Sequence, residues 1–249
     1  MIEDIETILN KINSFNENNQ SDDDIKKIYE AVLNNVSNNK KYFFSNYSNL
    51  INKIIDTQTL NSNIVNKYLK NLKGIEIGGS SNADYGIDVI HVDRIDLHSM
   101  KEDHKYKNFQ IEDAGYIQKA DIISNGDDLP FKDNTVDFVF VSHVFEHFYD
   151  PIKALKEWYR VVKKGGYILL IVPNKERMFD KYRERTTLNE LIKRHSGELK
   201  TDDMYEDKHH NVWITEDVIE ICKYLNFNVI EYEEYNNAVD NSFSVVIQK

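Results

Sequence analysis

The sequence predicts an α/β fold with a doubly wound, seven-stranded and mostly parallel sheet. Short segments rich in Ile and Val alternate with helical patterns from Ile64 onward. Most of these segments are apolar almost throughout, which is typical of parallel strands that are buried on both faces. A glycine pair, Gly78-Gly79, directly follows the first segment. These observations favour a sheet that binds its ligand beyond the carboxyl ends of its strands.

Each expected strand is a short apolar run, and helical stretches such as IKALKEWYRVVKK supply the crossovers between them. The runs are GIEI (74–77), DVIHV (88–92), ADIIS (120–124), VDFVFV (136–141), GYILLIV (166–172), FNVIEYEE (227–234) and SFSVVIQ (242–248). The last two runs are close enough in the sequence to pair as antiparallel neighbours at an edge of the sheet.

Residues 1–63 are expected to form a helical N-terminal extension, because apolar residues recur there at helical spacing. Ile2, Ile5, Leu9 and Ile12 make the first such stripe. The asparagine-rich composition is an argument for disorder, but disordered segments lack such regular stripes. Residues 64–249 form the main domain, with an insertion at 175–226 that should carry substrate choice. We expect the extension to cover a binding cleft of the main domain.

Composition narrows the class of protein. A net charge of -11 repels nucleic acid and anionic membranes. No apolar run approaches the roughly 20 residues that a membrane-spanning helix needs. Cys222 is the only cysteine, so an internal disulfide is excluded. We therefore expect a soluble, cytoplasmic protein whose partner is a small-molecule substrate.

The turn after the first strand is poorly suited to phosphate. Gly78-Gly79-Ser80-Ser81 lacks the third glycine of a dinucleotide fingerprint, and an acidic residue, Glu76, stands two places before it. An uncharged nucleoside with a zwitterionic tail fits such a turn better. Asp93, at the end of the second strand, is placed to accept hydrogen bonds from both ribose hydroxyls.

Two further strands deliver polar residues to the same edge. Asn125 and Gly126 follow the third strand, where an amide and backbone N–H groups can meet an adenine edge. The fourth strand delivers Ser142 and His143. Glu146 and His147 follow them, and we interpret this pair as structural, because capping is common where a loop leads into a helix.

Five ordered motifs, EIGG, HVD, NGDDLPF, VDFVFVSHVFEH and VVKKGGYILLIVPN, resemble those of class I S-adenosylmethionine-dependent methyltransferases of the small-molecule type. The resemblance covers about Ile64 to Asn174. It implies that the cofactor is S-adenosylmethionine, that Asp93 holds the ribose, and that His143 lies near the sulfonium. The remaining cofactor-binding residues that it implies are Glu76, Gly78, Gly79, Asn125, Gly126 and Ser142. Two positions depart from the family pattern: Ser80 stands at a usual glycine and Asn125 at a frequent aspartate.

The insertion contains polar aromatic residues, arginines and paired histidines. Arginine binds anions in a fork and aromatic faces stack on sugar rings. This composition suits a sugar-like or phosphorylated acceptor, and the segment is more loosely similar to methyltransferases of surface-polysaccharide (capsular polysaccharide) assembly. A solvated helical insert without a binding role is the alternative. The expected substrate-binding residues are Tyr182, Arg183, Arg185 and Trp213.

The acceptor atom is predicted to be a hydroxyl oxygen. The Asn/Asp-Pro-Pro-Tyr sequence of base-amino methylation is absent after the fourth strand, and Cys222 lies on an amphipathic helical pattern rather than in a nucleophile's place. An alcohol needs a base with a pKa near 7, which histidine provides. We prefer His210 to His209, and either of these to His143, as that base.

Three alternatives remain at this point. A metal could be held by Asp207, His209 and His210, but the set is incomplete and no metal is predicted. A nicotinamide-dependent oxidoreductase is suggested by the spacing of Tyr149 and Lys153, although Pro151 lies between them and the glycine fingerprint is missing. A non-catalytic subunit that keeps the cofactor fold is the third alternative.

Overall fold

A computed structural model describes residues 60–79, 84–101, 107, 119–204, 208–236 and 238–249. The described residues belong to one compact unit, Thr59–Lys249. The predicted helical extension lies outside the described residues except for its last four, 60–63, so its helices and its covering role stay predictions. Among the helices that are described, none is long and apolar enough to cross a membrane.

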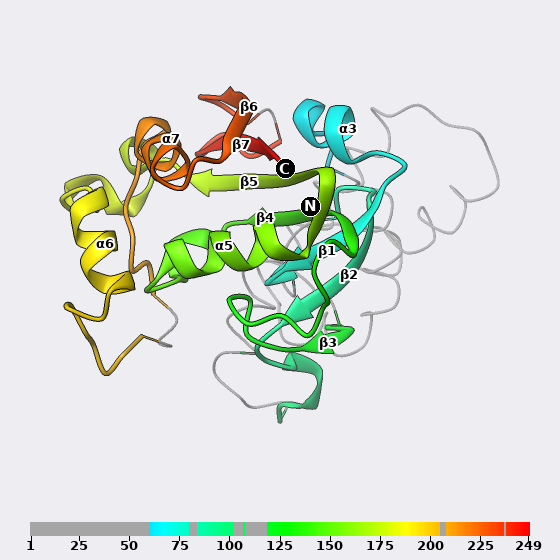
Figure 1. Ribbon diagram of the computed structural model, residues 1–249, viewed down its shortest axis with the longest axis horizontal. Coiled ribbons are helices and arrows are strands. Elements are labelled where there is room, and N and C mark those ends of the chain that lie inside the picture. The colour runs from blue at the N-terminus through cyan, green and yellow to red at the C-terminus, as the bar shows by residue number, and fades with distance from the viewer. Residues whose placement is uncertain (1–59, 80–83, 102–106, 108–118, 205–207, 237) are drawn as a thin grey trace, which may run out of the picture. The chain divides into compact units, whose positions relative to one another are not determined.

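Seven strands form one sheet in the order β3-β2-β1-β4-β5-β7-β6 (Figure 1). β1 to β5 run parallel, and β7 is antiparallel to both β5 and the edge strand β6. The predicted fold class and the antiparallel final pair are thus confirmed. The strands are β1 (Lys73–Ile77), β2 (Asp88–Asp93), β3 (Ile122–Ile123), β4 (Val136–Ser142), β5 (Val162–Pro173), β6 (Asn228–Glu233) and β7 (Ser242–Gln248).

The first crossover helix ends earlier than its sequence pattern predicted. Helix α5 (Pro151–Val161) begins with proline in its first turn, and the Asp150 carboxylate caps it by accepting from the Lys153 amide at 2.9 Å. The chain becomes extended at Val162, so β5 starts there. Farther along β5, a Cβ at Gly166 would lie 2.3 Å from the Asp137 carbonyl oxygen. Only glycine lets the two strands approach so closely.

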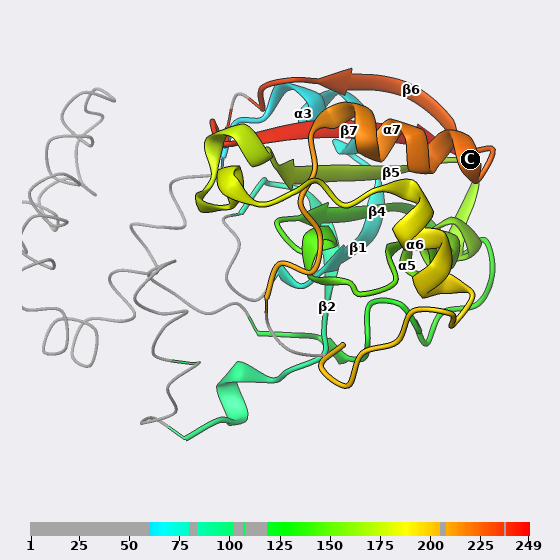
Figure 2. The same cartoon turned by 90° about the vertical axis from the view of Figure 1, so that its left-hand side faces the viewer.

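The sheet has a hydrophobic core on each face. One core packs α5, α6 (Leu188–His195) and α7 (Thr215–Tyr224) against β1, β4, β5 and β7 around the buried ring of Trp158. The other core packs α3 (Asn63–Leu69) and Tyr85 against Phe138 and Phe140. Figure 1 shows α5 running alongside β4 and β5, and Figure 2 shows α5, α6 and α7 close together on their side of the sheet. α7 begins at Thr215.

The predicted insertion lies between β5 and β6. It contains two short 3-10 helices, η4 (Lys175–Arg177) and η5 (Phe179–Tyr182), followed by α6 and an extended stretch that leads to α7. In Figure 1 the arrowhead of β5 points toward the yellow segment that carries α6. The insertion therefore starts at the carboxyl edge of the sheet, where ligands bind in doubly wound folds.

Candidate active site at the carboxyl edge of the sheet

Strand register brings the sequence-predicted cofactor residues together. Ile77 of β1 pairs with Val92 of β2 and with Val141 of β4. The residue after each of these lies at the same edge: Gly78, Asp93 and Ser142. Asp93 also pairs with Ile123 of β3, so Asn125 and Gly126 emerge next to it. The structure thus assembles residues from four strands into one continuous edge.

The two glycines of the first turn are required by protein atoms on both sides. Gly78 has φ +69°, which favours glycine, and a Cβ there would lie 2.6 Å from a methyl group of Val144. A Cβ at Gly79 would lie 2.5 Å from the carboxyl carbon of Glu76. The turn is therefore closely packed against the protein itself, whatever ligand lies beyond it. Ser80 and Ser81 lie outside the described residues.

Glu76 is a buried carboxylate with one oxygen still available. Its Oε2 lies 3.0 Å from His91 Nδ1 on β2, and that carboxylate raises the pKa of His91. Its Oε1 is buried and makes no hydrogen bond within the described part of the chain. A buried acceptor without a donor is costly. An N–H or ammonium group of a ligand at this turn would supply the missing donor.

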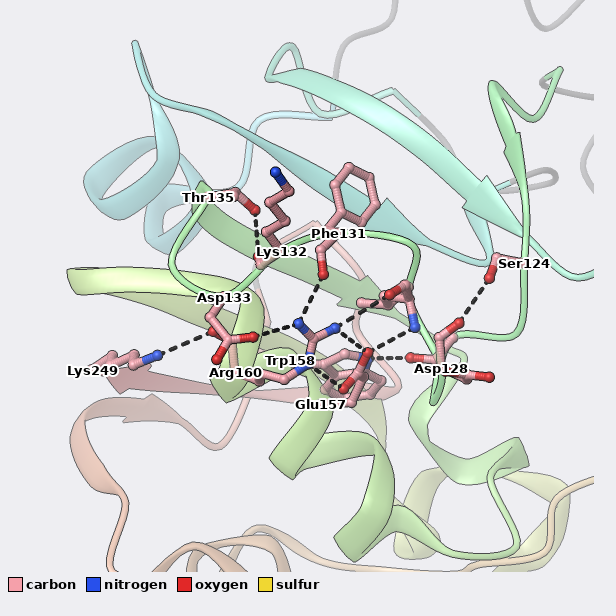
Figure 3. Close-up of polar contacts among 12 residues, drawn as sticks. Ser124, Asp128, Phe131, Lys132, Asp133, Thr135, Glu157, Trp158, Arg160 and Lys249 are labelled. Carbon is pink, nitrogen blue, oxygen red and sulfur yellow. Dashed lines mark hydrogen bonds and ion pairs between the residues drawn. The ribbon is translucent and has the colours of Figure 1, made fainter.

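The loop after β3 is held in place by three side chains of α5 (Figure 3). Arg160 donates to the carbonyl oxygens of Phe131 at 2.8 Å and Leu129 at 3.2 Å. Glu157 accepts from the Leu129 amide at 2.7 Å. Trp158 Nε1 donates to the Gly126 carbonyl oxygen at 2.7 Å. The main chain of the motif NGDDLPF is therefore fixed by α5, and Asn125 is left exposed at the edge.

His143 occupies a strained position where β4 ends. Its φ of +53° lies in the left-handed region, which a side chain other than Gly or Asn seldom adopts. Its Nε2 lies 2.6 Å from Ser242 Oγ, and that hydroxyl donates to Asn241 Oδ1 at 2.8 Å. Ser242 must therefore accept from Nε2–H, which leaves Nδ1 as the unprotonated nitrogen. Burial, with His209 and His147 nearby, lowers the pKa of His143 to about 4.

The two adjacent histidines of the insertion lie on opposite sides of an extended segment. Asn211 fixes this segment, because its backbone amide donates to the Glu146 carbonyl oxygen at 3.1 Å and its side-chain amide to that of Phe148 at 2.6 Å. Side chains alternate along extended backbone. His209 consequently faces Glu146, whereas the ring of His210 packs against the ring of Tyr149, with 5.7 Å between centroids.

His209 lies within a group of titratable side chains. Its Nδ1 is hydrogen-bonded to the buried carboxylate of Asp180, and its Nε2 lies 3.8 Å from Glu146 Oε1. The His147 ring lies edge-on to the His209 ring at 4.9 Å. Burial lowers the pKa of His209, and the Asp180 hydrogen bond acts in the opposite direction. The pKa of His210 is also lowered, chiefly by burial.

The predicted substrate-binding residues are divided between surface and core. Tyr182 is 87% exposed on η5. Arg183 is paired with Asp180 at 2.7 Å and Arg185 with Asp217 at 3.0 Å, so part of their charge is neutralised within the protein. Trp213 is buried in the main core, where its ring lies 4.9 Å from that of Phe145. Its large apolar ring is better placed inside the fold than at an acceptor surface.

The pair that suggested an oxidoreductase is not assembled. The Tyr149 hydroxyl donates to the Leu199 carbonyl oxygen at 3.1 Å, and Lys153 pairs with Asp127 at 2.9 Å. Each side chain therefore supports a different loop. A hydride-transfer site would need the two to face one substrate.

Sequence reasoning missed several residues that position the site. Asp180 and Asn211 act through contacts with residues 29 and 65 positions away, respectively, and no local pattern marks them. Glu157, Trp158 and Arg160 lie on a helix that was expected to serve only as a crossover. The only signal in the sequence was that these three residues lie close together near the end of the helix α5.

Comparison with known proteins identifies a related domain. A family profile described as "Methyltransferase domain" matches residues 80–170. An uncharacterized protein of Methanocaldococcus jannaschii is 32% identical over 111 residues, covering 44% of this chain and 47% of that protein. The ubiquinone/menaquinone biosynthesis C-methyltransferase of Haemophilus ducreyi is 46% identical over 61 residues, or 24% of this chain and 22% of that protein. The chain thus spans less than half the length of these relatives.

A solved structure, that of a SAM-dependent methyltransferase from Archaeoglobus fulgidus, is 15% identical, with a TM-score of 0.46, and the match covers 84% of this chain and all of the other. The cofactor of the matched domain family is S-adenosylmethionine, and the edge described above fits it. Glu76 offers a buried acceptor without a donor, and Asp93 lies one strand away. Residues 80–170 thus match a methyltransferase domain family, and they lie within a seven-stranded, mostly parallel sheet.

Proposed function

We propose that the protein transfers a methyl group from S-adenosylmethionine to a hydroxyl oxygen of a small polar acceptor, such as a sugar, a nucleotide-sugar or a phosphorylated metabolite. The single observation that carries the activity is the common edge formed by Gly78, Asp93 and Ser142, the last two within the matched methyltransferase domain. S-adenosylmethionine supplies an electrophilic methyl group on a sulfonium sulfur. The chain must then bind the acceptor, orient it and accept its proton.

The carboxyl edge holds the cofactor in this proposal. Asp93 accepts hydrogen bonds from the ribose hydroxyls, and Glu76 accepts from the amino end through its available Oε1. Asn125 is exposed beside the clamped loop and meets the adenine. The carbonyl oxygen of Gly126 is engaged by Trp158, so that residue contributes its shape and its amide rather than its carbonyl.

The insertion supplies the acceptor side. Aromatic rings are exposed there: Phe179 is 73% and Tyr182 87% exposed, and the Arg177 guanidinium stacks over the Tyr235 ring at 3.4 Å. Flat aromatic faces suit sugar rings, and a stacked guanidinium keeps donors for an anionic group. The arginines at 183 and 185 contribute less than the sequence suggested, because each has a carboxylate partner.

Of the three candidate histidines, His209 has the best geometry for proton transfer. The Asp180 carboxylate fixes Nδ1 as the donor nitrogen and leaves Nε2 with its lone pair, which is the arrangement of a histidine base oriented by a third group. His143 offers Nδ1, but a pKa of about 4 makes it a weak base. His210 packs against Tyr149 on the other side of its segment. His209 is therefore preferred to His210, which reverses the order expected from the sequence.

Cofactor binding and acceptor identity are tested separately. Saturating S-adenosylmethionine, at a hundredfold its dissociation constant, should stabilise the protein by about 2.7 kcal/mol. Asp93→Ala should weaken cofactor binding by roughly tenfold to a hundredfold, since it removes hydrogen bonds to a charged group worth about 1.5 to 3 kcal/mol. An unchanged melting temperature of the parent protein at saturating cofactor would contradict the assignment.

The acceptor is identified by incubation with a panel of sugars, nucleotide-sugars and phosphorylated metabolites, followed by mass spectrometry for a gain of one methylene. Demethylated quinones belong in the panel, because one relative is named a quinone-pathway C-methyltransferase. A product from a quinone alone would replace the hydroxyl assignment by carbon methylation. Cofactor binding without any product would favour a non-catalytic subunit.

A further inference from the structure

Two histidines and one glutamate lie together at the carboxyl edge. The sequence predicted a structural role for two of them, Glu146 and His147, and a role as base for His209. Glu146 and His147 lie in η3 (Phe145–His147), directly after β4, and His209 comes from the insertion. One ligating atom of each lies within 4.8 Å of the other two. His147 Nε2 and His209 Nε2 are each 3.8 Å from the same oxygen, Glu146 Oε1. We propose that Glu146, His147 and His209 bind a divalent transition-metal ion of the zinc type.

The spacing of these atoms is close to that of a metal site. Zinc bonds of about 2.0 to 2.2 Å in a tetrahedral arrangement place neighbouring ligand atoms roughly 3.3 to 3.5 Å apart. The two separations of 3.8 Å from Glu146 Oε1 need to close by only a few tenths of an ångström, and the ligating nitrogens of His147 and His209 lie within 4.8 Å of each other. Rotation of the imidazole rings supplies that movement, because χ2 of histidine is a broad torsion.

The surroundings of His209 are those of a metal-binding histidine. Such histidines usually donate the second ring N–H to a carboxylate, which fixes the tautomer and the direction of the ligating nitrogen. Asp180 fills this place on Nδ1 of His209. Arg183 in turn donates to Asp180 at 2.7 Å, so the orienting carboxylate is itself held. Asn211 fixes the backbone two residues beyond His209 against the carbonyl oxygen of Glu146.

The chemical types of the three ligands and the exposure of their side chains limit which metal ion can bind. Two imidazoles and one carboxylate favour zinc and other transition metals, whereas magnesium prefers oxygen ligands and retains its water. The Glu146 side chain is 2% exposed, that of His209 12% and that of His147 29%. The group is therefore buried at the carboxylate and open to solvent at the histidines, which provides a route for the ion. Three protein ligands leave at least one position for water or a substrate oxygen.

The site deepens the proposed function, and the inference about mechanism rests on that function. A metal held by His209 Nε2 occupies the lone pair that would otherwise accept the acceptor's proton. The ion would then activate the acceptor hydroxyl by lowering its pKa, in place of a free imidazole. The acceptor class is narrowed accordingly to compounds whose reacting hydroxyl has a neighbouring oxygen that can share the ion, such as vicinal diols. Metal binding itself requires neither cofactor nor acceptor.

The test is zinc binding by the full chain, after chelator treatment and buffer exchange, in competition with a colorimetric chelator and without S-adenosylmethionine. We expect one zinc ion per chain. Cobalt, used as a spectroscopic probe, should give the d–d absorption of a four- or five-coordinate site. Millimolar magnesium should not displace either ion. A parent protein that takes up no zinc, or shows only the spectrum of six-coordinate aqueous cobalt, would overturn the proposal.

Variants separate this site from other histidine–carboxylate pairs. Glu146→Gln and His209→Ala should each weaken zinc binding by at least about tenfold, and Asp180→Asn by roughly tenfold to a hundredfold. The matched control is His195→Ala, because His195 also pairs with a carboxylate, Asp150 at 2.9 Å, but lies on α6 outside the group. Equal zinc loss in His195→Ala and His209→Ala, or full zinc affinity in Glu146→Gln, would contradict the assignment.

Folding of each variant is verified by the shift of its melting temperature with S-adenosylmethionine, which uses the other part of the edge. The same measurement distinguishes the two proposals. Zinc binding without any cofactor-induced shift would leave the metal site standing and remove the methyltransferase assignment. A cofactor-induced shift of the melting temperature in a protein that binds no zinc would support the methyltransferase assignment and overturn the metal site.

Discussion

In the proposed function, the cofactor side and the acceptor side of the site are built in different ways. On the cofactor side, one helix holds the loop after β3: Arg160, Glu157 and Trp158 lie within four residues of α5 and bind main-chain atoms of that loop. On the acceptor side, His209 depends on Asp180 and on a segment that Asn211 ties to the loop after β4. Three segments that are far apart in the sequence must meet there.

The difference shows why one side is conspicuous in the sequence and the other is not. Consecutive residues with a common task form a motif, such as NGDDLPF. Residues that meet only after folding leave no pattern at any fixed spacing. The cofactor side also uses backbone groups, which every residue provides, whereas the acceptor side uses particular side chains. Substitutions should therefore change binding of the cofactor gradually and chemistry at the acceptor abruptly.

The largest effect is expected at His209. His209→Ala should lower turnover by roughly a hundredfold to ten-thousandfold, because the variant loses the imidazole that acts as the base or holds the ion. His210→Ala should cause the smaller loss, since its ring faces Tyr149. Turnover is measured with cofactor affinity determined separately for each variant. If the two variants lose turnover equally, the prediction that His209 rather than His210 acts in catalysis is wrong.

The next effect concerns His143 and pH. Its folded-state pKa of about 4 lies below the ordinary 6.5, so folding favours the neutral ring. The contribution of His143 to the free energy of unfolding is fully present above pH 6.5. It is lost as the pH falls toward 4, and the total loss is about 3 kcal/mol. Urea denaturation of metal-free protein across this range measures the loss.

His143→Asn is the informative variant for that prediction. Asparagine tolerates the left-handed φ of +53° and does not titrate. The drop in the free energy of unfolding between pH 6.5 and 4 should therefore become smaller than in the parent protein. An identical drop in both proteins would show that His143 is not its source.

Removal of the clamp on the cofactor side should have a moderate effect. Arg160→Ala leaves the carbonyl oxygens of Leu129 and Phe131 without this donor, which should lower the free energy of unfolding by about 1 to 3 kcal/mol and weaken cofactor binding. Urea denaturation and a cofactor titration measure the two effects. Lys163→Ala serves as the control, because its ion pair with Asp137 is largely exposed and should contribute less than about 1 kcal/mol.

The smallest effect is expected from a single hydrogen bond. Trp158→Phe removes the bond from Nε1 to the Gly126 carbonyl oxygen, at a cost of about 1 kcal/mol beyond the loss of packing. Trp213→Phe is a matched control, since that buried Nε1 makes no hydrogen bond with any described residue. Thermal unfolding of both variants isolates the bond. Trp213→Phe should cost less, and equal costs would mean that the bond contributes nothing measurable.

Much of the fold could be predicted because it depends on local pattern. The apolar runs at 136–141 and 166–172 are buried in the sheet as β4 and β5. Helix α7 begins at Thr215, with two acidic residues in its first turn. The early end of α5 at Val161 could not be predicted, because Val162 already pairs with Val136 of the neighbouring strand β4. The helical pattern of residues before Val162 cannot predict a contact between two strands.

The site divides in the same way. Asp93 was identified because the end of a strand next to a glycine turn has a fixed meaning in a parallel sheet. Trp213 was expected at a substrate surface and is instead buried beside Phe145. A tryptophan in a polar stretch suggests exposure, but burial depends on which elements pack around it. Glu146 and His147 were interpreted as structural because capping is common where a loop leads into a helix, and His209, which lies beside them, is more than 60 positions away in the sequence.

The sequence by itself determined the strands, the mostly parallel character of the sheet and the residues that follow its strands, because alternation of apolar runs with helices permits few other arrangements. Tertiary structure alone decided which residues of the insertion face that edge. Asn211 anchors an extended segment in one register, and that register turns His209 toward Glu146 and His210 toward Tyr149. A shift of one residue would exchange the two histidines, and only packing across the fold prevents it.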